Sequence, residues 1–250
     1  MCGRYAASAG QDQLVETFAI DEVVDLPPPS WNVAPTDRVA AVVERPAAPA
    51  DGAGSPGDHA PRPETIRRLV APRWGLVPSW AKSPATGAAM INARVETVAS
   101  KPAFRRPLSR RRCLLPADGY YEWYDTQLTD RRGKPVKQPF FIRPADGGLL
   151  VMAGLYEFWK HPDTGEWLTS CAVITTTATD ALGHIHDRMP MVIRPEAWDA
   201  WLDPGLVDAD AAVALLSVTD AEGLEAYAVS RAVGNVRNNG PDLVAPIDES

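Results

Sequence analysis

The chain has 250 residues, a length that suits one large domain or two small ones, and its composition of 45% hydrophobic and 23% charged residues is typical of a soluble globular protein. It has no apolar run of the roughly 20 residues that span a bilayer and no basic-then-apolar leader, so we expect no membrane segment, no secretory signal and a cytosolic location. The formal net charge of −7 argues against a uniformly basic, nucleic-acid-binding surface.

The first residues of the chain are Met1, Cys2, Gly3 and Arg4. If the initiator methionine is removed, Cys2 carries a free α-amine and a thiol, whose reference pKa values are about 7.7–8.0 and about 8.5. This pair predicts an N-terminal nucleophile. The alternative interpretation is an ordinary second residue, disordered or buried, as free cysteines often are.

The two other cysteines, Cys113 and Cys171, lie in apolar, strand-like runs far from Cys2. The odd number and wide spacing argue against a zinc site and a disulfide framework. We therefore expect Cys113 and Cys171 to be buried core thiols, and we expect no metal and no cofactor.

The first third of the chain predicts one helix and one hairpin. Residues 10–20 have helical spacing of apolar side chains, and residues 26–30 are proline-rich and extended. Two short apolar runs, 39–43 and 66–70, predict a strand pair with a flexible Pro/Gly/Ala loop over 46–63 at its tip. Residues 73–80 predict an irregular core loop or, alternatively, an aromatic wall for a base or sugar.

Polar clusters mark the middle of the chain. A strand over 91–95 would place Asn92, Arg94 and Glu96 on one face, and Thr97 is expected to cap a helix that runs into residue 104. Residues 101–112 carry six basic side chains and no acid, which predicts a local basic face or a solvated helix end. Glu122 lies among aromatic residues, where desolvation would raise its pKa.

The remainder of the chain predicts more strands than helices. Residues 125–138 are expected to form a surface hairpin loop, and strands are expected at 140–142, 149–153, 172–174 and 191–193. Helices are expected from Pro195 and over 208–216. His184 and His186 are candidates for acid–base chemistry rather than metal ligands, because nothing completes a metal shell.

Seven of these segments, in this order, resemble the SRAP family, named for SOS-response-associated peptidases. They are Met1-Cys2-Gly3-Arg4-Tyr5, Asn32-Val33-Ala34-Pro35-Thr36, Arg73-Trp74-Gly75-Leu76-Val77-Pro78, Ile91-Asn92-Ala93-Arg94-Val95-Glu96-Thr97, Asp118-Gly119-Tyr120-Tyr121-Glu122-Trp123, His186-Asp187-Arg188-Met189-Pro190 and Val229-Ser230-Arg231-Ala232-Val233-Gly234-Asn235. The resemblance implies an α+β fold, a single SRAP-like domain over residues 1–250 with a β-rich, barrel-like core, flanking helices and a short acidic tail at 247–250.

The resemblance also implies a function in the DNA damage response. Members of this family bond covalently to abasic sites in single-stranded DNA and shield them from cleavage. By this resemblance Cys2 forms a thiazolidine crosslink after loss of Met1, in a self-processing peptidase step with possible lyase-type chemistry. The implied catalytic positions are Cys2, Asn92, Glu122 and His186, and the implied DNA-binding positions are Arg4, Asn32, Pro35, Trp74, Arg94 and Arg188.

The expected partner is therefore single-stranded DNA that contains an abasic site, with no membrane and no metal, and with association with the nucleoid when bound. A monomer is favoured. After residue 194, acidic residues outnumber basic ones eleven to two, so we expect moderate, salt-sensitive DNA binding.

Three alternative functions stay open on the sequence. One is an N-terminal-nucleophile, glutamine-amidotransferase-like hydrolase, another is an autopeptidase, and the third is a non-enzymatic single-strand-binding module.

Overall fold

The computed structural model describes residues 2–47, 64–178, 185–216 and 223–247. Within these residues the backbone forms a five-stranded and a nine-stranded sheet. The five-stranded sheet has the order β14-β10-β9-β1-β3, formed by β1 (Tyr5–Ala7), β3 (Ser30–Val33), β9 (Gly119–Thr129), β10 (Pro135–Pro144) and β14 (Leu224–Ala228). Its paired strands are antiparallel.

The nine-stranded sheet has the order β13-β12-β11-β8-β4-β5-β2, and β6 and β7 both pair in parallel with β12. Its strands are β2 (Glu22–Val23), β4 (Ala41–Pro46), β5 (Thr65–Val70), β6 (Arg73–Trp74), β7 (Asn92–Arg94), β8 (Arg112–Ala117), β11 (Leu150–Lys160), β12 (Trp167–Thr177) and β13 (Arg188–Pro190). The two sheets do not close into one barrel, which refines the expected barrel-like core, whereas the α+β class is confirmed.

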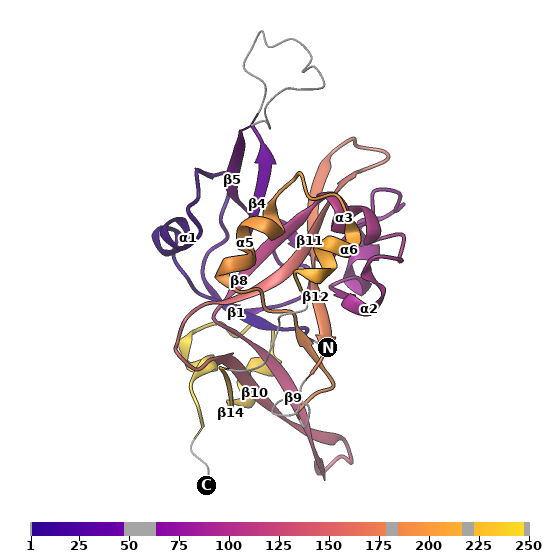
Figure 1. Cartoon of the computed structure of the whole chain (residues 1–250). Helices are drawn as coiled ribbons and strands as arrows, with labels where there is room; N and C mark the ends of the chain where they lie inside the picture. The colour runs from indigo at the N-terminus through magenta and orange to yellow at the C-terminus, as the bar shows by residue number, and fades with distance from the viewer. Residues whose placement is uncertain (1, 48–63, 179–184, 217–222, 248–250) are drawn as a thin grey trace, which may run out of the picture.

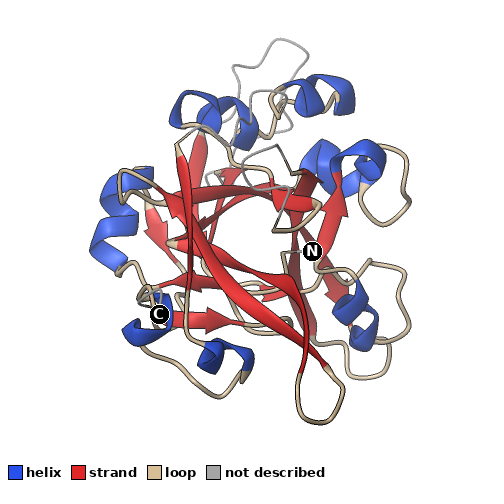
Figure 2. Cartoon of the chain, turned by 90° about the horizontal axis from the view of Figure 1, so that it is seen from below, coloured by secondary structure: helices blue, strands red, loops and turns tan. Residues whose placement is uncertain are grey.

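Short helices cover the outside of the strands (Figure 2). The α-helices are α1 (Gln11–Phe18), α2 (Val95–Val98), α3 (Arg105–Arg110), α5 (Pro195–Leu202) and α6 (Ala209–Ala214), and the 3-10 helices are η1 (Pro84–Ala89), η2 (Arg231–Gly234) and η3 (Pro241–Val244). None of the helices in the described ranges is long and apolar enough to cross a membrane.

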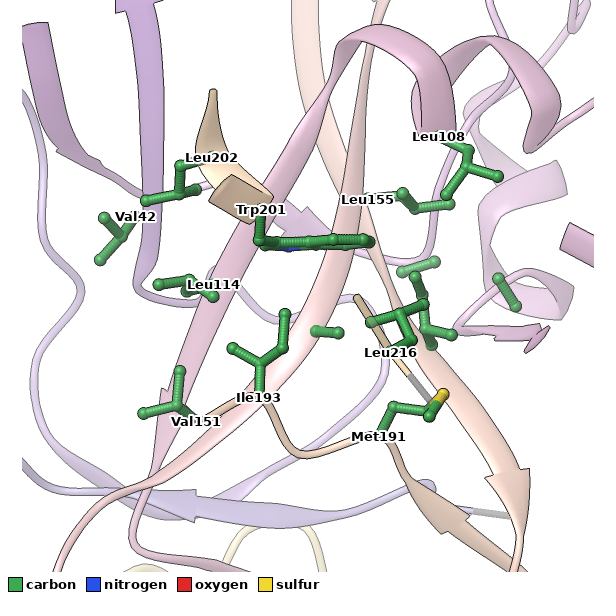
Figure 3. Packing of buried hydrophobic residues seen from close by; sticks show 14 of the residues in the cluster. Val42, Leu108, Leu114, Val151, Leu155, Met191, Ile193, Trp201, Leu202 and Leu216 are labelled. Carbon is green, nitrogen blue, oxygen red and sulfur yellow. The ribbon is translucent and has the colours of Figure 1, made fainter. Parts of the chain in front are cut away.

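Three apolar clusters order these layers. The inter-sheet core includes Tyr5 and Tyr120 from the five-stranded sheet together with Met152 and Cys171 from the nine-stranded sheet. A helix-side core lies on the other face of the nine-stranded sheet, where Trp201 of α5 packs among side chains of β8, β11 and the 191–193 segment (Figure 3). A third cluster joins the outer face of β9 and β10 to η2 and η3.

Alternation along β9 explains why one strand serves two of these clusters. Successive side chains of a strand point to opposite faces. Tyr120 therefore points into the inter-sheet core, while Tyr121 packs under the C-terminal 3-10 helices. Glu122 points to the same side as Tyr120.

Most of the expected elements are present. The helix near residues 10–20, the β4–β5 strand pair and the helix from Pro195 are confirmed, and Cys113 and Cys171 are fully buried. Asp208 caps α6 by accepting hydrogen bonds from two backbone N–H groups. Of the expected flexible loop, residues 48–63 lie outside the described residues, as do His184 and residues 248–250 of the acidic tail.

Three local predictions need correction. The hairpin expected at 125–138 is present, but its loop is shorter than expected, because β9 and β10 continue through the segment and leave a turn only between Thr129 and Pro135 (Figure 1). No single helix runs from Thr97 to residue 104, because the chain forms two short helices, α2 and α3, and Thr97 lies inside the first. The strand expected at 191–193 ends earlier, as β13.

Candidate active site

Cys2 lies just before β1 and is completely buried in the inter-sheet core. Its backbone carbonyl accepts a hydrogen bond of 2.8 Å from Nδ2 of Asn92. Asn92 opens β7, opposite Val173 of β12, so the nine-stranded sheet fixes the amide beside the cysteine. The Oδ1 of Asn92 is buried and has no hydrogen-bond partner among the described residues, which leaves an acceptor for an incoming group.

Burial sets the protonation of the thiol and of the nearest carboxyl. Burial, and then the charge of Glu122, raises the pKa of the Cys2 thiol well above its usual range. The Glu122 side chain is itself buried. Burial is the main reason that the pKa of Glu122 is raised to about 7, and the charge of Asp187 also acts to raise it. Glu122 can therefore take up or release a proton near neutral pH.

His186 faces Glu122 from the segment before β13. Its Nε2 lies 4.0 Å from Oε2 of Glu122. Its Nδ1 lies 3.0 Å from the backbone nitrogen of Arg188, whose N–H points to it. The Nδ1 also lies 2.9 Å from Oδ1 of Asp187. Burial lowers the pKa of His186 and outweighs the attraction of Asp187.

The structure thus gathers the four predicted catalytic residues from four separate segments. Asn92 touches Cys2, His186 approaches Glu122, and the charge of Glu122 acts on the Cys2 thiol. Their catalytic role stays a prediction. No group of three or more His, Cys, Asp or Glu side chains suited to a metal ion occurs in the described part of the chain.

Arg188 and Arg94 differ in their availability for phosphate. Arg188 donates two hydrogen bonds to Glu96, of 2.6 and 3.1 Å, and one of 2.7 Å to the carbonyl of Thr175. A phosphate at Arg188 would have to compete with Glu96. Arg94, the last residue of β7, is exposed, as expected from the alternation with buried Ala93.

Arg4 and Asn32 connect the start of the chain to its C-terminal segment. One guanidinium nitrogen of Arg4 donates to Oδ1 of Asn32 at 2.6 Å and to the carbonyl of Val233 at 2.9 Å. Nδ2 of Asn32 donates to the carbonyls of Val233, Asn235 and Asn238. Asn32 is 3% exposed. Its predicted DNA contact is thus not available in this structure, and its amide positions the 233–238 segment instead.

The structure also corrects the prediction that Trp74 is an aromatic side chain of the DNA-binding groove. Trp74 is completely buried, its Nε1 donates to the carbonyl of Ile91 at 2.9 Å, and its ring packs edge-on against Tyr5. It has no face on which a base could stack. Within the segment 73–80 the exposed aromatic residue is Trp80, which is 62% exposed. Pro35, half-buried, lies in a turn whose next residue is joined to Trp74 by a backbone hydrogen bond.

Sequence reasoning missed three further groups at this site. Asp187 contacts the imidazole, and Glu96 holds Arg188. Tyr120 is fully buried, and after burial itself the charges of Cys2 and Glu122 raise its pKa well above the usual value. All three lie within the motifs already singled out, but only their contacts give them a role.

The fold and the site together define an α+β protein of two sheets in which Cys2 is buried, an amide bonds its backbone carbonyl, and a carboxyl faces an imidazole. Residues 1–236 match the family described as SOS response associated peptidase (SRAP), and the chain belongs to this family.

Named relatives and solved structures agree with this placement. The chain is 38% identical over 248 residues to abasic site processing protein YoqW of Bacillus subtilis, covering 98% of this chain and 99% of YoqW. It is 36% identical over 211 residues to abasic site processing protein HMCES of Mus musculus, covering 72% of this chain and 58% of HMCES. A crystal structure from Bacteroides thetaiotaomicron superposes with a TM-score of 0.77 at 23% identity, covering 98% of this chain and all of that one, and so shares the fold.

Proposed function

We propose that this protein processes abasic sites in single-stranded DNA by bonding covalently to them through Cys2 after removal of Met1. The observation that carries the proposal is the hydrogen bond from Asn92 to the backbone carbonyl of Cys2. It is accompanied by the buried carboxyl of Glu122, whose pKa is raised to about 7. The names of the relatives YoqW and HMCES support the same substrate.

In the proposed reaction the α-amine of Cys2 adds to the C1′ aldehyde of the ring-opened sugar. Loss of one water gives a Schiff base. The thiol sulfur then adds to the same carbon, the thiol proton is transferred to nitrogen, and a five-membered thiazolidine closes. This second step is intramolecular, and well-oriented intramolecular reactions reach effective molarities of roughly 10⁵–10⁸ M.

The surrounding side chains supply proton transfer and orientation. Glu122, with a pKa of about 7, accepts a proton from the amine or thiol and returns it to the departing hydroxyl. His186 assists opening of the sugar ring, with its Nε2 toward Glu122. Asn92 holds the Cys2 backbone and offers its buried Oδ1 to the amine or the sugar.

Phosphates next to the lesion are the proposed ligands of Arg4, Arg94 and Arg188. Arg94 is exposed. Arg188 can bind a phosphate only if it gives up its ion pair with Glu96. We therefore expect this ion pair to break when DNA binds. The chain as a whole carries a net charge of −7, so the contact with DNA is expected to be local.

The test is the intact mass of the protein before and after incubation with an abasic single-stranded oligonucleotide. We expect loss of Met1 and a stable adduct that Cys2→Ala does not form, while Cys113→Ala, which alters a buried thiol outside the site, still forms it. A protein without Met1 that forms no adduct would contradict the proposal and favour the amidotransferase alternative, for which glutamine hydrolysis is the assay. Equal protection of abasic DNA by Cys2→Ala would favour the binding module.

The self-processing step is tested separately by the same measurement. Glu122→Gln and wild type are produced in a cell-free system that lacks methionine aminopeptidase activity. We expect Met1 to be lost from the wild type and retained in the variant. Retention of Met1 in both would remove the autopeptidase step from the proposal while leaving the crosslink intact.

A further inference from the structure

A second cavity lies outside the candidate active site, between the β4–β5 pair and the β11–β12 pair. It has two compartments, of about 560 and about 470 Å³, which share Arg45, Phe158 and Trp167. Volumes of this size are in the range of small-molecule sites.

The cavity and the Cys2 site lie at different positions along β12. Along β12 the cavity is lined by Trp167, Leu168 and Thr169, whereas Asn92 of the Cys2 site pairs with Val173. At about 3.3 Å per residue, Val173 is roughly 20 Å from Trp167 and roughly 13 Å from Thr169. In Figure 1 the β4–β5 and β11–β12 pairs reach to the top of the molecule, while the N-terminus lies in the lower half.

The lining is strongly basic in an acidic protein. Across both compartments six cationic side chains face two acidic ones, Asp25 and Glu157. Both acids are already used, because Asp25 pairs with Arg38 and Glu157 pairs with Arg111. The cations are Arg38, Arg45, Arg68, Arg73, Arg111 and Lys160.

Arg45 is the cation at the junction of the two compartments. Its guanidinium lies 4.4 Å from the centroid of the Phe158 ring, and its Nε donates to the hydroxyl of Tyr156 at 3.2 Å. No acidic side chain among the described residues pairs with Arg45 or Lys160. The stack on Phe158 orients the guanidinium and leaves its terminal nitrogens for an anion.

Trp167 supplies an aromatic surface next to these cations. Its side chain is 67% exposed, although a tryptophan is usually well buried. The ammonium of Lys160 lies 5.6 Å from its ring. An exposed indole beside unpaired cations is the combination that binds a nucleotide, because the base stacks on the ring and the phosphate pairs with the cation.

We propose that this cavity is a second binding site, for a nucleotide, in which Arg45 and Lys160 bind the phosphate and Trp167 stacks against the base. The site takes either a free nucleotide or one unit of an intact DNA strand. It does not depend on the chemistry at Cys2, so either proposal can fail without the other.

The test follows Trp167 directly by ¹⁹F NMR of the full chain labelled with 5-fluorotryptophan, with Trp167→Phe to assign the resonance. Cys2→Ala is the background, and the probes are dTMP and the tetranucleotide of thymidine, neither of which has an abasic site. We expect the Trp167 resonance to shift with saturation, and the affinity to fall about tenfold or more in Arg45→Ala, since a charge-assisted hydrogen bond is lost.

The matched control is Arg143→Ala, which removes a half-exposed arginine of the five-stranded sheet that pairs with Glu225 and is expected to leave the affinity unchanged. Tighter binding of the tetranucleotide than of dTMP would identify a DNA strand as the ligand of this site. Equal binding of the two probes would identify a free nucleotide as the ligand. The proposal is overturned by the absence of a shift with both probes, or by equal affinities of Arg45→Ala and wild type, with the thermal unfolding midpoint showing that the variant is folded.

Discussion

Burial shifts the pKa values of two titratable side chains at the candidate site, in opposite directions. The pKa of Glu122 is raised to about 7, and that of His186 is lowered. A buried carboxyl and a neutral imidazole 4.0 Å apart can exchange a proton near neutral pH at little cost. Acid–base roles need groups of this kind, because a strong acid or base would be in one form only.

The raised pKa of Glu122 predicts a pH-dependent contribution to stability. Because the folded state holds the proton up to about pH 7 and the unfolded state releases it near 4.5, stability falls as pH rises between these values. The expected loss is on the order of 3 kcal/mol in the free energy of unfolding, at 1.36 kcal/mol per pKa unit. Urea unfolding of wild type and Glu122→Gln from pH 4.5 to 8 measures the difference. A constant difference across that range would contradict the burial of an ionisable carboxyl.

The hydrogen bond from Asn92 predicts a rate effect. In Asn92→Asp the donor to the Cys2 carbonyl becomes an acceptor next to Glu122, and we expect the single-turnover crosslinking rate to fall by roughly 10- to 100-fold, the equivalent of about 1–3 kcal/mol. Asn92→Ala, which removes the bond without adding charge, is the comparison and should lose less. If Asn92→Asp reacted as fast as wild type, the amide would have no part in positioning Cys2.

At the scale of elements, the C-terminal 3-10 helices are attached to the N-terminal half by a few buried contacts. Asn32 of β3 bonds three carbonyls between residues 233 and 238, and the guanidinium of Arg4 donates to the carbonyl of Val233. These bonds hold the segment of short 3-10 helices on the outer face of the five-stranded sheet.

Asn32→Ala is therefore expected to loosen one element rather than the whole fold. Leaving buried carbonyls unpaired costs about 1–3 kcal/mol each. We expect faster amide hydrogen exchange in residues 231–244 and unchanged exchange in β11 and β12. Asn235→Ala, at an exposed position of the same segment, is the matched control. Uniformly faster exchange across both sheets would mean that Asn32 supports global stability instead.

At the scale of the whole molecule, the negative net charge limits the strength of DNA binding. Three arginines, Arg4, Arg94 and Arg188, are the proposed phosphate contacts. For single strands the logarithm of the affinity changes with the logarithm of salt by about −0.7 per contact. We expect a slope near −2 for Cys2→Ala on intact single-stranded DNA, measured by fluorescence anisotropy.

Removal of one of these contacts should be visible in the same measurement. Arg94→Ala is expected to reduce the steepness of the slope by about 0.7, while Arg143→Ala leaves it unchanged. Affinity that does not vary with salt would contradict phosphate recognition at this site.

Patterns that are local in sequence predicted much of the fold. The spacing of Leu14 and Phe18 predicts α1, and the apolar runs predict β4 and β5. The hairpin at 125–138 was predicted but the length of its strands was not, because the polar residues of this segment suit a long loop as well as exposed paired strands, and strand pairing decides between the two.

The order of motifs determined the family and named the four residues that the structure gathers at the candidate site, because a motif is a property of the chain alone. Burial decided the rest. Trp74 and Trp80 belong to one segment, 73–80, yet one ring is enclosed and the other exposed. Arg112, read as part of a basic surface, is buried and bonds three carbonyls. Which side chains reach solvent, and which pKa values shift, depends on neighbours distant in sequence, and only the tertiary structure brings those neighbours together.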